Sequence, residues 1–478
     1  MREFRCIASA DVEFLHPDSP RAERLEMPNV NLLTGLNGGG KSTVLKAIVA
    51  AALGTNLQDR QFDVSGWVRR DGKDDCRLRV GILRHPSDGK EDKEAGLGGV
   101  QRLSFEARIP RKNEILEVVE GARGKKSIIG DDDPGFFIAA YGPTRQASLI
   151  AGRTAERAGE YMRVGLGGAT AADESMRIQR VASLLSERAL LKPLESWLPE
   201  CRSKSPRRFD EVLKLLGRTM PPVTQFDGDK EGDAYLFVHD GVKVPYGALS
   251  EGLRSHISWI ADLLYHLTRA APSDTPLDEV PGIVLVDEID QRLHPRWQLD
   301  ILSWLSAALP ALQFIVTSHS PLLAGGLRPA NIAVLEPDHD SDGPGASRVR
   351  TVIDDVFGRS ADGVLTSSYF DLASTRADPF RKHLRELVRM TRSGSKDAPM
   401  QLMKVLGNPQ EMKPIEELDK PEKKRKRKSA GGKRKAKEKD KKKSRKKAKK
   451  KAKKKTRKKG KKKTKGRRKA KGRGRSGR

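Results

Sequence analysis

Gly35-Leu-Asn-Gly-Gly-Gly-Lys41-Ser42-Thr43 is the stretch that decides the fold of this 478-residue chain. It fits the pattern Gly-x-x-x-x-Gly-Lys-Ser/Thr, in which every fixed position has a mechanical reason. Glycines let backbone N–H groups turn toward a phosphate, the lysine reaches the β- and γ-phosphates, and the Ser42 hydroxyl is a ligand for Mg²⁺. A strand is expected at residues 29–33 and a helix from about residue 42, whose N-terminal dipole favours an anion.

The loop therefore predicts a P-loop NTPase that binds ATP with Mg²⁺. The residues expected to hold the nucleotide in this loop are Gly35, Asn37, Gly38, Gly39, Gly40, Lys41, Ser42 and Thr43. No aromatic residue before the loop is assigned to adenine, and Phe4 and Phe14 are the candidates.

A pair of carboxylates follows an apolar strand in Gly282-Ile-Val-Leu-Val-Asp287-Glu288. A buried strand would deliver Asp287 to the tip of a sheet beside the phosphate loop, where it would hold Mg²⁺ directly or through water. Glu288 would orient the attacking water. Phosphoryl transfer has a loose transition state, so positioning and charge neutralisation supply most of the catalysis. The alternative, a strand that merely meets solvent at two acids, is weakened by the phosphate loop.

The remaining pattern predicts an α/β fold with inserts. Strand-like stretches at 78–83, 103–109 and 115–119 are separated by charged loops and indicate antiparallel pairing. Residues 170–218 show helical periodicity, and Asp240-Gly241 between two apolar runs indicates a hairpin. From Glu251 onward, helices alternate with the strands at 283–286 and 314–317, which favours a parallel sheet covered by helices.

The net charge of +30 belongs to one end of the chain. Residues 421–478 hold 37 Lys or Arg against three acids, which leaves a net charge of −4 for residues 1–420. This Lys/Arg-rich segment has no aromatic residue and cannot bury a core, so we expect a disordered tail that binds nucleic acid by counterion release. It resembles the tails of linker histones. A solubilising extension and binding to another polyanion, such as an anionic membrane, are the alternatives.

Cysteine usage and hydropathy indicate the compartment. Cys6, Cys76 and Cys201 lie far apart without a Cys-x-x-Cys spacing, which argues against a disulfide framework or a Cys-based zinc site. The N-terminus lacks a signal-peptide core, and no run of about 18 apolar residues is present. We expect a cytoplasmic protein, associated with the nucleoid through its tail, and no membrane partner.

Three further segments resemble motifs of ABC-type ATPases. Leu249-Ser250-Glu251-Gly252-Leu253-Arg254 resembles the ABC signature, and the resemblance implies that Ser250 and Gly252 cup the nucleotide of a second subunit. His319 resembles the switch histidine, which contacts the γ-phosphate and the water. Gln146, in Tyr141-Gly-Pro-Thr-Arg145-Gln146, is the candidate Q-loop glutamine, although Arg145 is an equal candidate for phosphate sensing. The alternatives without a catalytic role are that Ser250 is an N-cap, that His319 is a structural histidine and that Tyr141–Gln146 forms a Gly-Pro turn.

The full set of motifs resembles the AAA/ABC-type ATPases grouped with RecF, SMC heads, OLD proteins and the Septu ATPase PtuA. Residues 29–48 resemble that group's pattern around the phosphate loop. Asp287-Glu-Ile-Asp-Gln-Arg-Leu293-His294-Pro295-Arg-Trp-Gln298 resembles the segment that replaces the D-loop of transporters. Phe357-Gly-Arg-Ser-Ala-Asp-Gly-Val-Leu365 resembles a segment found after the switch histidine in defence-type members. No long heptad run exists, so SMC-type coiled-coil arms are not expected.

The resemblance implies an ATP-dependent homodimer that acts on DNA in repair or anti-phage defence, with a separate nuclease as a partner. A nuclease of the Toprim type within this chain is the weaker interpretation of four acids, and an acidic hairpin loop explains them better. These are Glu336, Asp338, Asp340 and Asp342. The alternative functions are a transporter ATPase subunit and a chromatin-like DNA-binding protein with a vestigial ATPase.

The expected domain organisation follows from these segments. Residues 1–400 form an ABC-type ATPase head with a mixed sheet. It contains an antiparallel β subdomain at about 60–120 and a helical insert at about 150–230. Residues 401–420 form a linker, and residues 421–478 form the disordered tail.

Overall fold

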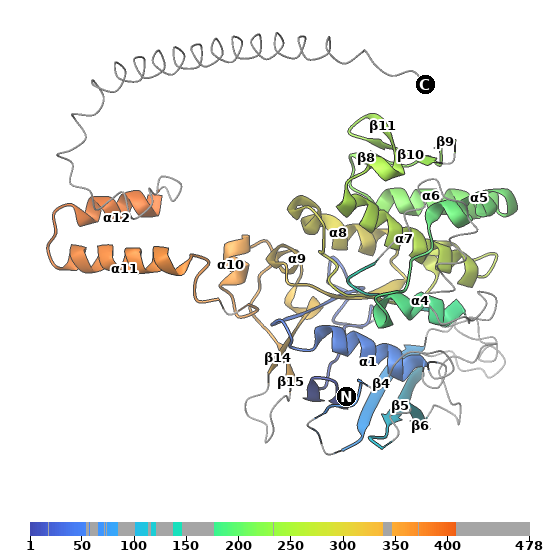
Figure 1. The fold of residues 1–478 in the computed structure, drawn as a ribbon, viewed down its shortest axis with the longest axis horizontal. Helices are drawn as coiled ribbons and strands as arrows, with labels where there is room; N and C mark the ends of the chain where they lie inside the picture. Colours follow the sequence, from blue (N-terminus) through green and yellow to red (C-terminus); the bar gives the residue numbers. More distant parts are fainter. Residues whose placement is uncertain are drawn as a thin grey trace, which may run out of the picture. The chain divides into compact units, whose positions relative to one another are not determined.

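The computed structural model describes residues 1–17, 19–53, 57, 66–70, 72, 74–84, 101–112, 116–120, 137–145, 176–232, 234–337, 347–370 and 372–407. The described residues divide into two units, the first ending at Thr375 and the second beginning at Arg376 (Figure 1). The predicted basic tail at 421–478 lies outside the described residues.

A six-stranded sheet with the order β15-β14-β3-β13-β12-β7 organises the first unit. Its strands are β3 (Val30–Gly35), β7 (Phe137–Tyr141), β12 (Gly282–Val286), β13 (Leu312–Thr317), β14 (Ile332–Pro337) and β15 (Ser347–Thr351). All neighbours pair in parallel except β14 and β15, which form an antiparallel hairpin. The phosphate loop, the acid pair and the predicted switch histidine each follow a parallel strand, so the register brings them to one edge of the sheet.

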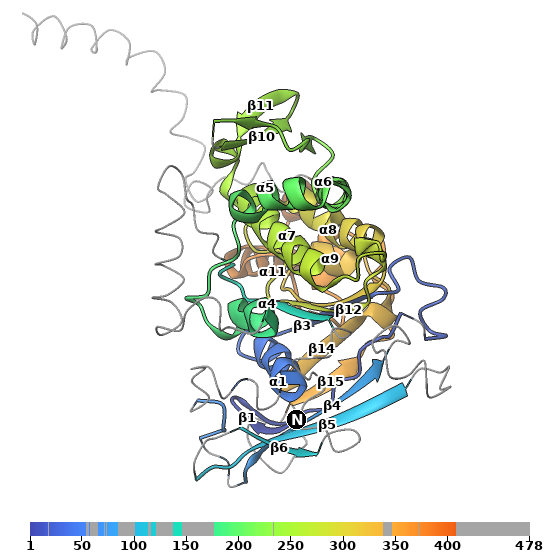
Figure 2. The same ribbon diagram turned by 90° about the vertical axis from the view of Figure 1, so that its right-hand side faces the viewer.

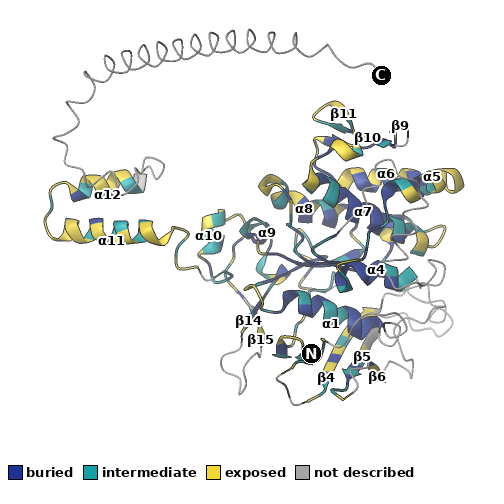
Figure 3. Cartoon of the chain, in the orientation of Figure 1, coloured by how far each residue is buried: buried dark blue, intermediate teal, exposed yellow. Residues whose placement is uncertain are grey.

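Both faces of this sheet are buried, which explains why its strands are continuous apolar runs. In β12, Val284 and Val286 join the larger core on one face, while Leu285 joins a second core on the other. β13 repeats the alternation with Phe314 and Ile315. Figure 3 shows the central strands in the colour of buried residues.

Helix α1 (Lys41–Leu53) and an antiparallel sheet cover one face. The sheet has the order β2-β1-β4-β5-β6, with β1 (Arg2–Phe4), β2 (Ile7–Ser9), β4 (Cys76–Arg84), β5 (Gln101–Ile109) and β6 (Glu117–Glu120). Figure 2 shows α1 between the two sheets. The antiparallel pairing expected for these strands is confirmed.

Helices cover the opposite face of the central sheet (Figure 2). They are α5 (Leu194–Lys204), α6 (Pro206–Thr219), α7 (Glu251–Ala270) and α8 (Pro295–Ala308), while α4 (Met176–Leu185) packs beside β7. Short strands β8 (Thr224–Gln225), β9 (Lys230–Glu231), β10 (Ala234–His239) and β11 (Val242–Pro245) lead into α7. The expected hairpin is present, because Asp240 and Gly241 both have the positive φ angles of its turn.

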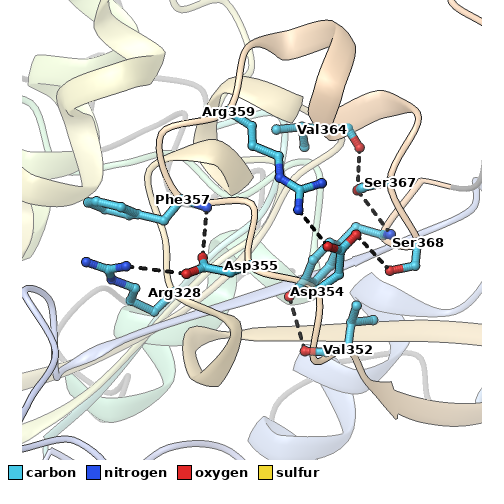
Figure 4. A network of polar contacts seen from close by, with 10 residues as sticks. Arg328, Val352, Asp354, Asp355, Phe357, Arg359, Val364, Ser367 and Ser368 are labelled. Carbon is cyan, nitrogen blue, oxygen red and sulfur yellow. Dashed lines mark hydrogen bonds and ion pairs between the residues drawn. The ribbon is translucent and has the colours of Figure 1, made fainter.

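The segment after β15 is fixed by a polar network (Figure 4). Arg359 pairs with Asp354 at 2.7 Å, and the Phe357 amide donates to Asp355 at 3.0 Å. Arg328 lies over the Phe357 ring with its guanidinium 3.8 Å from the centroid. Short helices α9 (Pro321–Gly325) and α10 (Ala361–Leu365) flank this network, which thereby holds the segment that resembles defence-type ATPases.

The second unit contains α11 (Asp378–Arg392) and α12 (Ala398–Gly407), which pack against each other. Lys382, Arg385, Arg389 and Arg392 are exposed on α11. Their spacing of three or four residues places them on one side of the helix. Across the part of the chain that the structure describes, no helix is both long and apolar enough to span a membrane.

Candidate active site

The phosphate loop has the backbone conformation that its glycines allow. Gly35 has φ 145° and Gly40 has φ 99°, values that residues with a Cβ rarely adopt. A Cβ on Gly35 would also lie 2.2 Å from the Leu335 carbonyl oxygen of neighbouring β14. The Gly39 amide donates to the Leu36 carbonyl at 3.1 Å and closes the loop. The loop tip at Asn37 and Gly38 is exposed.

Lys41, Ser42 and Thr43 form the first turn of α1, directly after the loop. Lys41 is buried, and its Nζ donates to the carbonyls of Gly35 and Leu36 at 3.1 and 3.0 Å. Burial lowers the pKa of this ammonium, while the charge of Asp287 opposes that shift. The lysine is therefore folded back across the loop, with a carboxylate as its main charged neighbour.

The acid pair follows β12 and is held from two neighbouring strands. The Asp287 amide donates to the Tyr141 carbonyl of β7 at 2.8 Å. The fully buried Thr317 hydroxyl of β13 donates to Asp287 Oδ1 at 2.5 Å. The same hydroxyl accepts the Glu288 amide at 2.8 Å. Thr317 thus fixes both acids, which places them at the carboxyl edge of the sheet.

Glu288 and His319 respond to the charges gathered at this edge. Burial raises the pKa of Glu288, and the neighbouring charges of Asp287 and Asp290 add to the rise. Partial desolvation lowers the pKa of His319, and the charge of Lys41 lowers it further. His319 is exposed two residues after β13. The structure therefore brings together Lys41, the acid pair and the histidine that the sequence singled out.

The predicted signature segment opens α7. Ser250 is exposed and is the N-cap of this helix, because its Oγ accepts the Leu253 amide at 3.3 Å. A Cβ on Gly252 would lie 2.1 Å from the Arg292 carbonyl, so the helix start abuts the loop after the acid pair. Capping does not exclude nucleotide binding, because the first turn of a helix has four amides without intrahelical partners and the Ser250 side chain accepts from one of them.

The structure describes only part of the candidate Q-loop. Tyr141 ends β7, and the described backbone continues to Arg145. Gln146 lies outside the described residues, so its predicted role stays a prediction. Arg145 is buried, and its Nη2 donates to the Glu288 carbonyl at 2.6 Å.

Two residues that position the site were given no role from the sequence, although Gln298 ends the segment that begins with the acid pair. One is Thr317, a polar residue at the buried end of a parallel strand. That position in the sequence was the signal that could have identified it. Gln298 is the other, since its Nε2 donates to the Leu293 carbonyl at 3.0 Å and its Oε1 accepts the Ser320 hydroxyl at 2.8 Å. Gln298 therefore ties the loop after the acid pair to the loop that carries His319.

The structure corrects one adenine candidate. Phe4 is fully buried and packs edge-on against Trp67, with ring centroids 5.6 Å apart, so it cannot stack on a base. Phe14 is half-buried and packs against the core clusters around α1.

The exposed thiol of Cys6, in the turn between β1 and β2, lies 3.6 Å from Thr43 Oγ1 beside the phosphate loop.

The donor set suits Mg²⁺ bound together with a triphosphate. Ser42 offers a hydroxyl at the start of α1 and Asp287 offers one carboxylate. No group of three His, Cys, Asp or Glu residues in the described ranges could hold a metal by itself. Mg²⁺ needs no such group, because it keeps several waters and uses one or two protein ligands plus phosphates.

The acids considered for a Toprim nuclease have a simpler role where they are described. Glu336 in β14 pairs with Arg348 at 2.9 Å and with Arg350 at 2.8 Å, across the β14–β15 hairpin. The predicted hairpin is confirmed. Asp338, Asp340 and Asp342 lie outside the described residues.

Comparison with known proteins identifies the family. The model of the family described as "AAA domain, putative AbiEii toxin, Type IV TA system" matches residues 30–325. The chain is 39% identical over 100 residues to the Septu protein PtuA of Bacillus mycoides (strain KBAB4), a match that covers 21% of this chain and 14% of that protein. It is 43% identical over 89 residues to the "Retron Ec83 probable ATPase" of Escherichia coli, which covers 18% of this chain and 16% of that protein.

Solved structures of SMC head domains are also similar to this chain. The head domain with an extended coiled coil from Pyrococcus furiosus, bound to the C-terminal domain of ScpA, gives a TM-score of 0.40 at 14% identity. This match covers 73% of the present chain and 94% of that one. The SMC head domain from Thermotoga maritima gives a TM-score of 0.37 at 12% identity, covering 73% and 96% of the two chains.

Proposed function

The chain belongs to the AAA-domain family whose model matches residues 30–325, an ABC-like group of P-loop ATPases, and on this premise we propose that it binds and hydrolyses ATP. The observation that carries the proposal is the joint placement of the loop lysine and the acid pair. Lys41 closes the phosphate loop, and Thr317 holds Asp287 and Glu288 at the adjoining strand end.

Hydrolysis follows from the roles of these residues. A water oxygen attacks the γ-phosphorus while the bond from that phosphorus to the β–γ bridging oxygen breaks, which releases ADP and phosphate. Glu288 orients the water and accepts its hydrogen bond, and Lys41 neutralises charge on the β- and γ-phosphates. Bound Mg²⁺, held by Ser42 and Asp287, would supply Lewis-acid neutralisation of the phosphate oxygens. His319 and Gln146 are proposed to contact the γ-phosphate and the water.

We further propose that two copies close over two ATP molecules. In this arrangement Ser250 and Gly252 of one copy complete the site of the other. Exposure of Ser250 at the start of the 20-residue helix α7 supports the proposal, since a helix N-terminus is a favourable place for a phosphate. ATP would join the two copies, and hydrolysis would release them.

Nucleic acid is the proposed partner of the C-terminal part. The Lys/Arg-rich sequence of residues 421–478 supports this, and so does the exposed cationic side of α11 with Lys382, Arg385, Arg389 and Arg392. Binding through such charges is salt-dependent and independent of base sequence. We assign the protein to DNA repair or anti-phage defence, acting in the cytoplasm on DNA with a separate nuclease as a partner.

The proposed domain organisation keeps an ATPase head at 1–400, a linker at 401–420 and a basic tail at 421–478. The compact unit that holds the whole candidate site ends at Thr375, and α11 and α12 belong to the second unit. The helical pair thus lies between the catalytic unit and the tail in sequence.

Glu288→Gln tests the function directly. Phosphate release from ATP by the purified full chain should fall by about 10²–10⁴-fold, as for loss of a residue that handles the attacking water. Nucleotide binding should persist, and the variant should elute with ATP as a dimer in size-exclusion chromatography with light scattering. Wild-type protein that releases no phosphate would refute the hydrolysis, and a persistent monomer of Glu288→Gln with ATP would refute the dimer.

A further inference from the structure

Arg145 is a buried cation that the proposed mechanism does not yet use. It lies four residues after β7 ends at Tyr141, and only 3% of it is exposed. Its backbone φ of 33° falls in the left-handed region, which is uncommon for a residue with a long side chain. Burial lowers the pKa of its guanidinium to about 10, and the charges of Asp287 and Asp290 counteract the fall. The side chain therefore remains a cation at neutral pH.

The guanidinium is joined to the main chain of the proposed catalytic acid. Its Nη2 donates to the Glu288 carbonyl oxygen at 2.6 Å. Glu288 itself has φ 49°, so two left-handed residues other than glycine are hydrogen-bonded to each other. Such conformations persist where the surrounding structure fixes them, and they concentrate at functional sites.

The Glu288 peptide groups are held from both sides of β12. The amide nitrogen of Glu288 donates to Thr317 of β13, while its carbonyl oxygen accepts from Arg145, which follows β7. Without the Arg145 bond, the carbonyl side of the turn loses this anchor. The peptide between Glu288 and Ile289 could then rotate toward an unstrained conformation, and the carboxylate would move with it.

Two other nitrogens of the Arg145 guanidinium have no hydrogen-bond partner within the described residues. Arg145 Nε and Nη1 are buried and make no hydrogen bond within the described structure. Buried donors without partners are rare in native proteins and call for an explanation. A purely structural arginine would be expected to donate these hydrogens to nearby carbonyls, whereas the hydrogen bond that Arg145 makes within the described residues goes to the Glu288 carbonyl.

We infer that Arg145 is a positioning residue for hydrolysis, which fixes the Glu288 turn in its left-handed conformation and so keeps the carboxylate directed at the attacking water. This inference rests on the proposed ATP hydrolysis. Arg145 would thus act on hydrolysis through Glu288, whereas the phosphate loop would set the affinity for the nucleotide.

Arg145→Met and Arg145→Lys in the full chain test the inference. Methionine keeps much of the apolar stem and removes the donors, so kcat for phosphate release should fall by about 10²-fold, with KM for ATP changed by less than about threefold. Lysine restores one donor and a charge, so it should recover part of kcat. Binding of a fluorescent ATP analogue should be the same for both variants and the wild type.

Arg180→Met is the matched control. Arg180 is also buried, its guanidinium lies 4.9 Å from the Phe137 ring centroid of the same strand β7, and burial lowers its pKa to about 10. It has no bond to Glu288, so loss of this buried cation should lower the melting temperature and leave kcat unchanged. The second control places Arg145→Met in the Glu288→Gln background, where it should cause no further loss, because the carboxylate to be positioned is already absent.

The outcomes separate the inference from the proposed function. If the wild type releases phosphate but both Arg145 variants keep its kcat, the inference is wrong and the function stands. An equal loss of kcat in Arg180→Met, or a further loss in the Glu288→Gln background, would also overturn it. If Arg145→Met does not fold, partial kcat with unchanged nucleotide binding in Arg145→Lys decides the question. A wild type without phosphate release overturns the function and the inference together.

Discussion

The Thr317 hydroxyl donates to Asp287 Oδ1 at 2.5 Å, across the boundary between β13 and β12. The same oxygen accepts the Glu288 amide at 2.8 Å, so one buried side chain organises both acids. Neighbouring parallel strands carry these residues, and the parallel register aligns Val286 with Val316 one position earlier. The Thr317 hydroxyl therefore links the end of β13, which precedes His319, to both acids that follow β12.

Thr317→Val should lower ATP turnover while preserving the shape of the site. Valine leaves Asp287 Oδ1 and the Glu288 amide without their partner, at a cost of about 1–3 kcal/mol for each buried unpaired group. Because both acids lose the hydroxyl that orients them, we also expect kcat to fall by about tenfold or more, which corresponds to about 1.4 kcal/mol in activation free energy. Thr317→Ser keeps the hydroxyl and should retain most of the activity in the same phosphate-release assay. Equal kcat in the valine variant and the wild type would contradict this role.

Gly252→Ala should disturb the start of α7. The new Cβ would lie 2.1 Å from the Arg292 carbonyl, so the helix and the loop after the acid pair must separate. We expect a loss of about 1–3 kcal/mol in the free energy of unfolding, as for overpacking, together with weaker ATP-dependent dimerisation. Gly247→Ala is the control, because a Cβ there meets no atom within 4 Å. Identical melting temperatures for the two variants would count against the close approach.

The buried carboxyl of Asp262 should make stability depend on pH. Burial raises its pKa to about 7, although the Lys192 amide donates to it at 2.7 Å and the Tyr141 hydroxyl at 3.0 Å. The folded state therefore binds more protons than the unfolded state between about pH 4 and 7. In that window this group makes the free energy of unfolding fall as pH rises, by at most about 1.4 kcal/mol per pH unit.

Asp262→Asn should remove that contribution, which urea unfolding at pH 5, 6 and 7.5 can measure as a difference from the wild type. The difference separates Asp262 from His256, whereas His266 Nε2 lies 3.5 Å from Asp262 Oδ2 and is read together with it. Burial lowers the pKa of these two histidines to about 4 and about 3, so they act in the opposite direction and lose stability as pH falls below 6.5. Asp300→Asn, at an exposed position of α8, is the control. A pH-independent difference between Asp262→Asn and the wild type would refute the prediction.

Deletion of residues 421–478 should weaken DNA binding and leave ATP binding intact. Each lost phosphate contact should reduce the slope of log affinity against log salt concentration by about 0.9 for duplex DNA. Within the remaining chain, replacing Lys382, Arg385, Arg389 and Arg392 of α11 by Gln should reduce the slope again. Four exposed cations of α5 and α6 serve as the control set: Arg202, Lys204, Arg207 and Lys214. A gel-shift salt titration that gives the truncated protein unchanged affinity would remove the tail from the proposal.

The sequence by itself determined which candidate residues lie at the carboxyl edge of the central sheet. Gly35–Thr43, the pair Asp287 and Glu288, and His319 could be recognised because short-range constraints dictate them: a phosphate loop needs glycines and a lysine at fixed spacing, and a buried parallel strand is a continuous apolar run. The same local logic predicted the antiparallel strands of the β subdomain and the Asp240-Gly241 hairpin.

Only the tertiary structure decided which residues hold the acids in place. Thr317 and Asp287 are 30 positions apart in the sequence, and Arg145 and Glu288 are 143 apart. Their contacts exist because β7, β12 and β13 are neighbours in the sheet, and no spacing in the sequence encodes that order. Phe4 is a further example. Its position before the loop made it a candidate for stacking on adenine, but in the fold it packs against Trp67 and is buried. Local patterns thus predict the candidate reacting groups, and strand order determines which side chains contact them.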